Sequence, residues 1–167
     1  RRRLQDSLLI AYKKHPDKIV AITDDAQYSY ADLYRESQSI AKHLKERGFN
    51  RGDRAAIFVE NSWNILTAVY GTLFAGGIFL VINHLTKQDK LAYILKDSQA
   101  AVLFSDTMVA KHFIPAVELA CSADLKQVIY AGEEIPSYLL LKLNAVHLYL
   151  FLSLNKYMRH TRMMTLV

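Results

Sequence analysis

Glycine-rich turns are the first candidates for chemistry, because they let backbone N–H groups approach a phosphate closely. The chain contains no G-x-x-x-x-G-K-[ST] loop, and no G-x-G-x-x-G that follows a strand and opens a helix. Its one glycine pair, Gly76-Gly77, precedes an apolar run. We interpret this pair as a tight helix-to-strand turn.

The single cysteine, Cys121, is the next candidate, since a thiolate is a strong nucleophile. No base lies near it in the sequence, and we interpret it as a small core thiol. One cysteine excludes an internal disulfide and a cysteine-built zinc site, and it fits a reducing cytoplasm. No two of the six histidines have the H-x-x-x-H spacing that binds a metal on one helix face.

Paired carboxylates can act as general acid and base, and the chain has two adjacent acidic pairs. Asp24-Asp25 and Glu133-Glu134 both lie in turn contexts, so we interpret them as solvated turn charges. His84 follows a strand end and is placed to line a cleft there, whereas Trp63 is interpreted as a packing anchor. We therefore assign no catalytic, cofactor-binding or metal-ligating residue.

The elements that would position any site begin with a small N-terminal arm. The apolar stripe of residues 4–14 predicts a helix, which ends before Pro16. Two short runs at 18–23 and 27–30 predict a hairpin. Ser29-x-x-Asp32 then resembles a capping box, which opens a helix that closes at Gly48.

Four short apolar runs follow, and they alternate with helical patterns from Arg54 to Tyr130. This alternation predicts an α/β fold with a mostly parallel sheet flanked by helices. The expected strands are 54–60, 78–82, 101–104 and 127–130, and the first two are expected to be buried. The expected helix starts are Asn61 or Ser62, Thr86, and Asp106 or Thr107, and the inward stripes are Leu66, Val69, Tyr70, Leu73 and Phe74; Leu91, Ile94 and Leu95; and Val109, Phe113 and Val117.

The net charge of +5 comes from the two ends of the chain. Three arginines open the sequence, and residues 137–167 carry four Lys and Arg and no acid. Residues 4–136 carry 14 Lys and Arg against 16 Asp and Glu. The body therefore lacks the basic stripe that follows a nucleic-acid backbone. No signal peptide is expected, because charged residues interrupt the apolar stretch after the arginines.

Residues 137–167 differ from the rest, since they contain no Gly, Asp or Glu. Their apolar run is shorter than the roughly 20 residues that span a bilayer. Three interpretations stay open. The segment is an apolar helix or strand pair on the sheet, or, as a weaker alternative, a membrane-surface segment. It could otherwise be foreign to the fold, through alternative splicing or a shifted reading frame.

Seven ordered segments within residues 4–136 resemble the adenylate-forming enzymes, which include acyl-CoA synthetases, luciferases and the adenylation domains of peptide synthetases. No single segment is specific, but their order and spacing are. The segments are 15–19 (HPDKI), 28–33 (YSYADL), 44–48 (LKERG), 51–57 (RGDRAAI), 60–62 (ENS), 74–83 (FAGGIFLVIN) and 91–98 (LAYILKDS). Glu60, Val81 and His84 stand where the family often has proline, which affects turn stiffness.

The resemblance implies an N-terminal subdomain at 4–136, followed by a divergent apolar, basic tail at 137–167. It implies a ligase that activates a carboxylic acid, fatty or aromatic, as acyl-adenylate and transfers it to a thiol. ATP, Mg²⁺ and coenzyme A are implied for the full-length enzyme. The family's Ser/Thr/Gly-rich phosphate loop has no counterpart here, so we expect a truncated, catalytically silent chain. The alternative is a non-catalytic interaction module that pairs with itself or with a full-length relative.

Overall fold

The computed structural model describes residues 3–24, 26–60, 63–132, 147–152 and 162–165. Its N-terminal arm consists of helix α1 (Leu4–Lys14) and an antiparallel hairpin of β1 (Ile19–Ile22) and β2 (Gln27–Ser29). Helix α2 (Tyr30–Glu46) begins with the predicted capping box, in which Ser29 Oγ accepts from the Asp32 amide and Asp32 accepts from the Ser29 amide. The predicted arm is therefore confirmed.

The main sheet has six strands in the order β4-β3-β5-β6-β7-β8. All neighbouring strands are parallel except β7 and β8, which confirms the predicted α/β class. The strands are β3 (Arg54–Phe58), β4 (Ile78–Val81), β5 (Val102–Asp106), β6 (Gln127–Ala131), β7 (His147–Leu152) and β8 (Arg162–Thr165).

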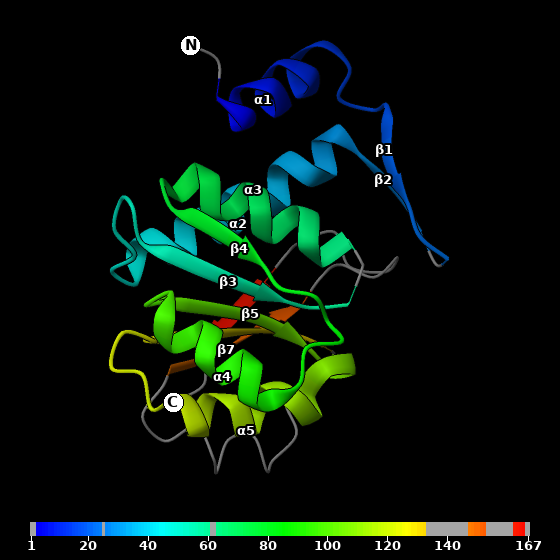
Figure 1. Ribbon diagram of the computed structural model, residues 1–167. Coiled ribbons are helices and arrows are strands. Elements are labelled where there is room, and N and C mark those ends of the chain that lie inside the picture. Colours follow the sequence, from blue (N-terminus) through cyan, green and yellow to red (C-terminus); the bar gives the residue numbers. More distant parts are fainter. Residues whose placement is uncertain (1–2, 25, 61–62, 133–146, 153–161, 166–167) are drawn as a thin grey trace.

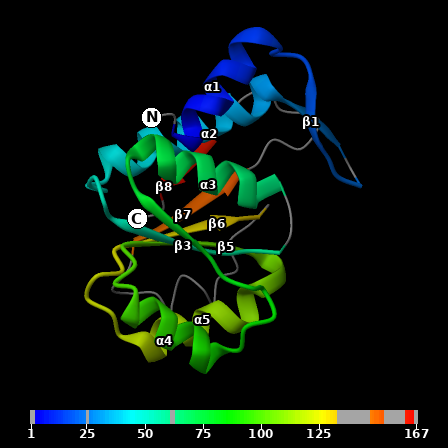
Figure 2. The same ribbon diagram turned by 45° about the horizontal axis from the view of Figure 1, so that its top comes forward.

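Helices cover both faces of this sheet (Figure 1). Helix α2 and α3 (Trp63–Ala75) lie on one face, and α4 (Gln88–Asp97) and α5 (Ala110–Ala120) on the other, as Figure 2 shows. A 3₁₀ turn, η1 (Thr107–Val109), precedes α5. Because side chains alternate along a strand, β3 sends Ala55 and Ile57 toward α2 and α3, and Ala56 and Phe58 toward α4 and α5. The arm packs outside α2 and α3 as a further layer.

The predicted inward stripe of α3 is wrong in its orientation. Leu66, Val69, Tyr70, Leu73 and Phe74 are only half-buried. The fully buried face carries smaller residues together with Trp63, at the helix start: Trp63, Thr67, Ala68, Gly71, Thr72 and Ala75. A helix that is apolar on all sides gives no hydropathy signal for its inward face, and here the close approach of α2 selects the small residues.

Two further expectations need correction at β4 and α4. Strand β4 is an edge strand, and Ile78 and Val81 are each 51% exposed, so it is not the buried strand that its apolar run suggests. Helix α4 has Lys87, not Thr86, at its N-cap, and Lys87 makes no capping hydrogen bond through its side chain. The inward residues of α4 and α5 lie as predicted: Leu91, Leu95, Val109, Phe113 and Val117 are buried, and Ile94 packs against them.

The C-terminal segment contributes strands β7 and β8 to the sheet. They form an antiparallel pair, and β7 also runs parallel to β6. A strand pair on the sheet was one of the predicted forms of this segment. Within the part of the chain that the structure describes, no helix is long and apolar enough to cross a bilayer.

Candidate functional site

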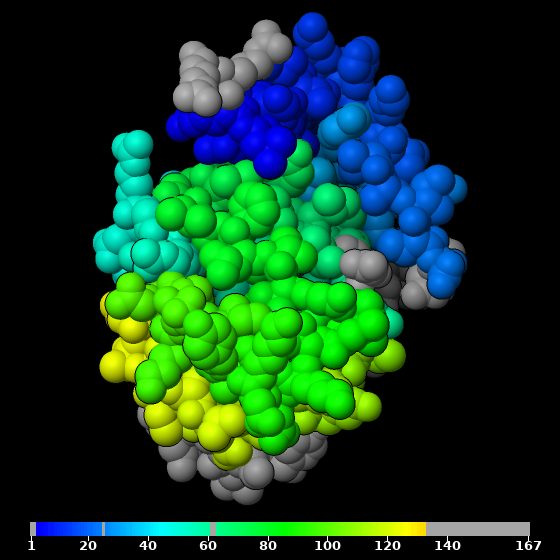
Figure 3. All heavy atoms as spheres, in the orientation of Figure 1, coloured from blue at the N-terminus to red at the C-terminus, as the bar shows by residue number. Residues whose placement is uncertain are grey.

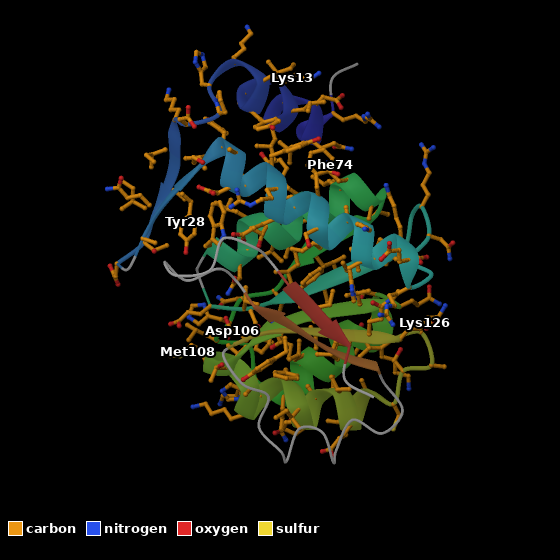
Figure 4. The ribbon with its side chains drawn as sticks, turned by 180° about the vertical axis from the view of Figure 1, so that it is seen from behind. Lys13, Tyr28, Phe74, Asp106, Met108 and Lys126 are labelled. Atoms are coloured by element: carbon orange, nitrogen blue, oxygen red, sulfur yellow. The ribbon has the colours of Figure 1, made fainter. Side chains whose placement is uncertain are left out.

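The order of the strands marks one place as a candidate ligand crevice. From β3 the chain passes through α3 to β4 on one side, and then through α4 to β5 on the other side. Open α/β sheets bind ligands where neighbouring connections diverge in this way, beyond the carboxyl ends of the strands. Here that point lies between the ends of β3 and β5, close to Asp106 and Met108 (Figure 4).

The Asp106 carboxylate occupies this switch point. Its Oδ2 accepts from the Glu60 amide at 3.0 Å, and its Oδ1 accepts from the Met108 and Val109 amides at 3.0 and 3.3 Å. Asp106 thus caps η1, as predicted, and also ties the end of β3 to the end of β5. Burial raises the pKa of Asp106, and the three amide donors oppose that rise. These amides therefore already donate hydrogen bonds to a carboxylate of the chain itself.

The end of β6 closes the same edge of the sheet. Tyr130 Oη donates to Thr107 Oγ1 at 2.9 Å. A side chain at Gly132 would meet both residues, because its Cβ would lie 2.8 Å from Thr107 Oγ1 and 2.8 Å from the Tyr130 ring. Glycine at this position therefore permits the close approach of the chain.

His84 lines a surface hollow, as its position after a strand end suggested. The hollow has a volume of about 250 Å³ and lies at the ends of β3 and β4. Its lining residues are Val59, Ile65, Val81, Ile82, Asn83, His84 and Leu85. Asn83 Oδ1 accepts from the Leu85 amide at 2.9 Å, so part of the polar lining serves the loop itself.

A second buried carboxyl group, Glu36, lies between α2 and α3. It is 1% exposed and accepts a hydrogen bond from Trp63 Nε1 at 2.7 Å. Burial raises the pKa of Glu36 to about 7, while the indole donor opposes the rise. Sequence reasoning missed Glu36, although it lies between Leu33 and Ile40 at helical spacing, and an acid on an inward face is a usable signal.

Trp63 is a packing anchor, as predicted. It is 4% exposed, and its ring stacks on Tyr28 with centroids 4.0 Å apart and an angle of 9° between the planes. The pair joins the arm to the first turn of α3.

Among the remaining candidates, the Gly76-Gly77 turn is confirmed, the burial of Cys121 is wrong, and the acidic pairs are described only at Asp24. Gly76 has φ +91° in the expected turn, and a Cβ at Gly77 would collide with the Phe49 ring. Cys121 is exposed and is not the core thiol that we predicted; it has φ +42° at the end of α5, and its thiol donates to the Glu118 carbonyl at 3.0 Å. Asp24 is exposed at the hairpin bend. Asp25, Glu133 and Glu134 lie outside the described residues.

The described residues contain no group of three His, Cys, Asp or Glu side chains that could hold a metal ion. The two buried carboxyl groups both accept hydrogen bonds within the fold. The prediction that the chain carries no catalytic or cofactor-binding residue stays a prediction.

The sequence of this chain is similar to segments of larger known enzymes. The chain is 34% identical to bacitracin synthase 1 of Bacillus licheniformis over 124 residues, which are 74% of this chain and 2% of that protein. It is 30% identical to a long-chain-fatty-acid–CoA ligase of Bacillus subtilis (strain 168) over 102 residues, 61% of this chain and 18% of the ligase. The chain thus spans only a small part of these relatives.

A solved structure has the same fold. It is the anthranilate CoA ligase AuaEII in complex with anthranoyl-AMP, with a TM-score of 0.72 and 24% identity over 80% of this chain and 25% of the ligase. The family model for AMP-binding enzymes matches residues 10–148, beyond the predicted subdomain boundary at 136. On this match, the chain belongs to the AMP-binding enzyme family.

Proposed function

We propose that the chain supplies the N-terminal subdomain of an ATP-dependent acid–thiol ligase. Such an enzyme joins a carboxylic acid, here a fatty or aromatic one, to AMP and then transfers the acyl group to a thiol such as coenzyme A. The family match over residues 10–148 carries this proposal. It is supported by the CoA ligases among the similar proteins, one of which was solved with the acyl-adenylate anthranoyl-AMP bound.

The 167 residues alone are proposed to be inactive. The amides at the switch point already donate to Asp106, so they do not fit the phosphates of Mg-ATP. The sequence also has no glycine-rich phosphate loop. The role of this subdomain is to hold the ends of β3, β5 and β6 in register at an edge where the rest of a ligase can dock.

Acid-dependent exchange of pyrophosphate into ATP tests both parts of this proposal. The purified chain should show no exchange above a blank with fatty and aromatic acids. A CoA ligase that lacks the segment equivalent to residues 10–148 should regain exchange when this chain is added. Exchange by the chain alone would overturn its inactivity, and failure of the mixture to gain activity would count against the subdomain role.

The open edge of β4 favours a second function, that of a non-catalytic interaction module. Ile78 and Val81 are each 51% exposed, and residues 75–83 carry no charge and no proline. Figure 3 shows the segment that contains β4 and α4 across the front of the molecule. Such an edge can pair with a strand of another chain. Sedimentation of a strictly monomeric chain at high concentration would contradict this function.

A further inference from the structure

The carboxyl group of Glu36 is buried without a cationic partner among the described residues. The Trp63 indole N–H donates to it at 2.7 Å. Arg35, the neighbouring cation, pairs with Asp32 at 2.7 Å and is half exposed. These two charges act on Glu36 with opposite signs, since Arg35 lowers its pKa and Asp32 raises it. From α3, the Trp63 indole contacts Glu36, and the Tyr28 ring of β2 stacks on that indole; neither ring carries a positive charge.

The hairpin that contacts Trp63 is separate from the main sheet. Tyr28, which stacks on Trp63, belongs to this two-stranded hairpin, and the hairpin has no ladder with the main sheet. Isolated two-stranded hairpins are marginally stable in water, so this one depends on its packing against the three helices α1, α2 and α3. That packing is a cluster around Leu8, Leu33 and Trp63. Outside this cluster, Ile19 and Ile22 of β1 are 43% and 73% exposed.

We propose that the β1–β2 hairpin is a proton-controlled latch: it lies closed over Glu36 while that side chain is neutral, and it opens more often when the side chain is ionised. A neutral carboxyl group is buried at modest cost, with the indole N–H as its donor. A carboxylate in the same place needs water, and one hydrogen bond does not replace its hydration. Lifting the hairpin, with Tyr28, admits water next to Trp63 and Glu36.

The pH dependence of hairpin opening follows from the pKa of Glu36 in the closed and open forms. Closed, Glu36 has a pKa of about 7, against an ordinary value of 4.5 when it is hydrated. Between these values the open form binds fewer protons than the closed form. The opening equilibrium therefore rises by up to tenfold per pH unit from about pH 5 to pH 7, and it is flat above pH 7.

Amide hydrogen exchange of the full chain tests the latch. The probes are the amides of Thr23 and Tyr30, which donate to the carbonyls of Ala26 and Lys18 at 2.8 and 3.1 Å. After correction for intrinsic exchange rates, their protection should fall by up to tenfold per pH unit between pH 5 and 7. Amides of α4 and α5 should keep their protection. Trp63 is the only tryptophan, so its fluorescence should change over the same range.

Variants separate the latch from general pH effects. Glu36→Gln should leave hairpin protection independent of pH, while Glu46→Gln, an exposed change on the same helix, should keep the wild-type response. Trp63→Phe removes the indole donor that opposes the rise in pKa, so the fall in protection should extend above pH 7. This second variant still reports through exchange if Glu36→Gln fails to fold.

Three results would overturn the latch. Hairpin protection could be flat in the wild-type chain, or Glu36→Gln could keep the slope. Amides of α4 and α5 could also lose protection together with the hairpin, which would show global unfolding.

Discussion

Two buried carboxyl groups in this chain are stabilised in different ways. Asp106 accepts three backbone hydrogen bonds at the end of β5, whereas Glu36 accepts one from an indole inside a helix pair. Amide donors favour the charged form of an acid, and burial disfavours it. Asp106 is therefore a structural anion that joins two loops. Of the two groups, Glu36 has fewer donors to its carboxylate, so burial disfavours its charged form more strongly.

Replacing Asp106 tests its role as a clamp. Asp106→Ala leaves the amides of Glu60, Met108 and Val109 without their acceptor, so we expect the free energy of unfolding to fall by about 2 kcal/mol. Urea denaturation measures this change. Asp124→Ala, at an exposed turn, is the matched control and should cost almost nothing. Equal losses from the two variants would show that the clamp contributes no stability.

The exposed thiol of Cys121 gives a second prediction. Because the side chain lies at the surface after α5, a thiol reagent should modify the folded chain at nearly the rate of the urea-unfolded chain. A core thiol would react orders of magnitude more slowly in the folded state. Absorbance of the released chromophore measures both rates, and the final yield should be one thiol per chain.

For single residues, the sequence predicted structural roles better than burial. Trp63 as an anchor and Asp106 as a cap followed from residue type and position. The exposure of Cys121 did not, since small thiols are usually buried and its left-handed backbone depends on how α5 ends. The position of Glu36 between Leu33 and Ile40 marks an inward face, but its partner, Trp63, lies 27 positions away and does not follow from the local pattern.

Among the elements, α2 and α3 pack so closely that their contact leaves no room for a side chain at Gly71. A Cβ at Gly71 would collide with the side chain of Ile40. Gly71→Ala should therefore lower the free energy of unfolding by about 2 kcal/mol, although alanine favours helix by about 1 kcal/mol. In a double-mutant cycle with Ile40→Ala, the cost of Gly71→Ala should nearly disappear. Additive costs would place the strain elsewhere.

The edge strand β4 calls for a solubility prediction. Natural edge strands often carry a lysine that blocks pairing with other chains, and this one has no charge. Val81→Lys should reduce aggregation at high concentration and leave the free energy of unfolding within about 0.5 kcal/mol, because Val81 is 51% exposed. Light scattering and urea denaturation measure the two effects. Unchanged light scattering would show that the β4 edge does not cause the aggregation.

Hydropathy patterns predicted which elements exist, and failed where packing alone decides. The strands and helices from α1 to β6 follow from periodicity and from capping residues such as Ser29. The edge position of β4 did not follow, because an apolar run looks the same at the edge and in the centre of a sheet. It is set by the direction in which the chain turns after α3.

For the whole molecule, two buried titratable groups act on stability with opposite signs. Burial lowers the pKa of His43 to about 4, and Arg47 adds to this effect. His43 therefore contributes stability above about pH 6.5 that is lost as the pH falls toward 4. Glu36 contributes stability below about pH 4.5 that is lost as the pH rises toward 7. Between pH 4.5 and 6.5 the two slopes oppose each other.

Single substitutions should expose each slope. His43→Gln leaves the Glu36 slope, so stability should fall by about 3 kcal/mol from pH 4.5 to 7. Glu36→Gln leaves the His43 slope, so stability should rise with pH over nearly the same range. Urea midpoints measured at half-unit steps of pH give both curves. Parallel curves for the two variants would contradict the assignment.

The strand order also bears on how the chain is made. After β3 and β4, every later strand is added on the same side of the sheet, in the sequence β5, β6, β7, β8. Each strand that leaves the ribosome can therefore dock on an edge that has already emerged, and no earlier strand has to move aside. The sheet can therefore form strand by strand from the N-terminal side during translation, because each new strand pairs with one that is already folded.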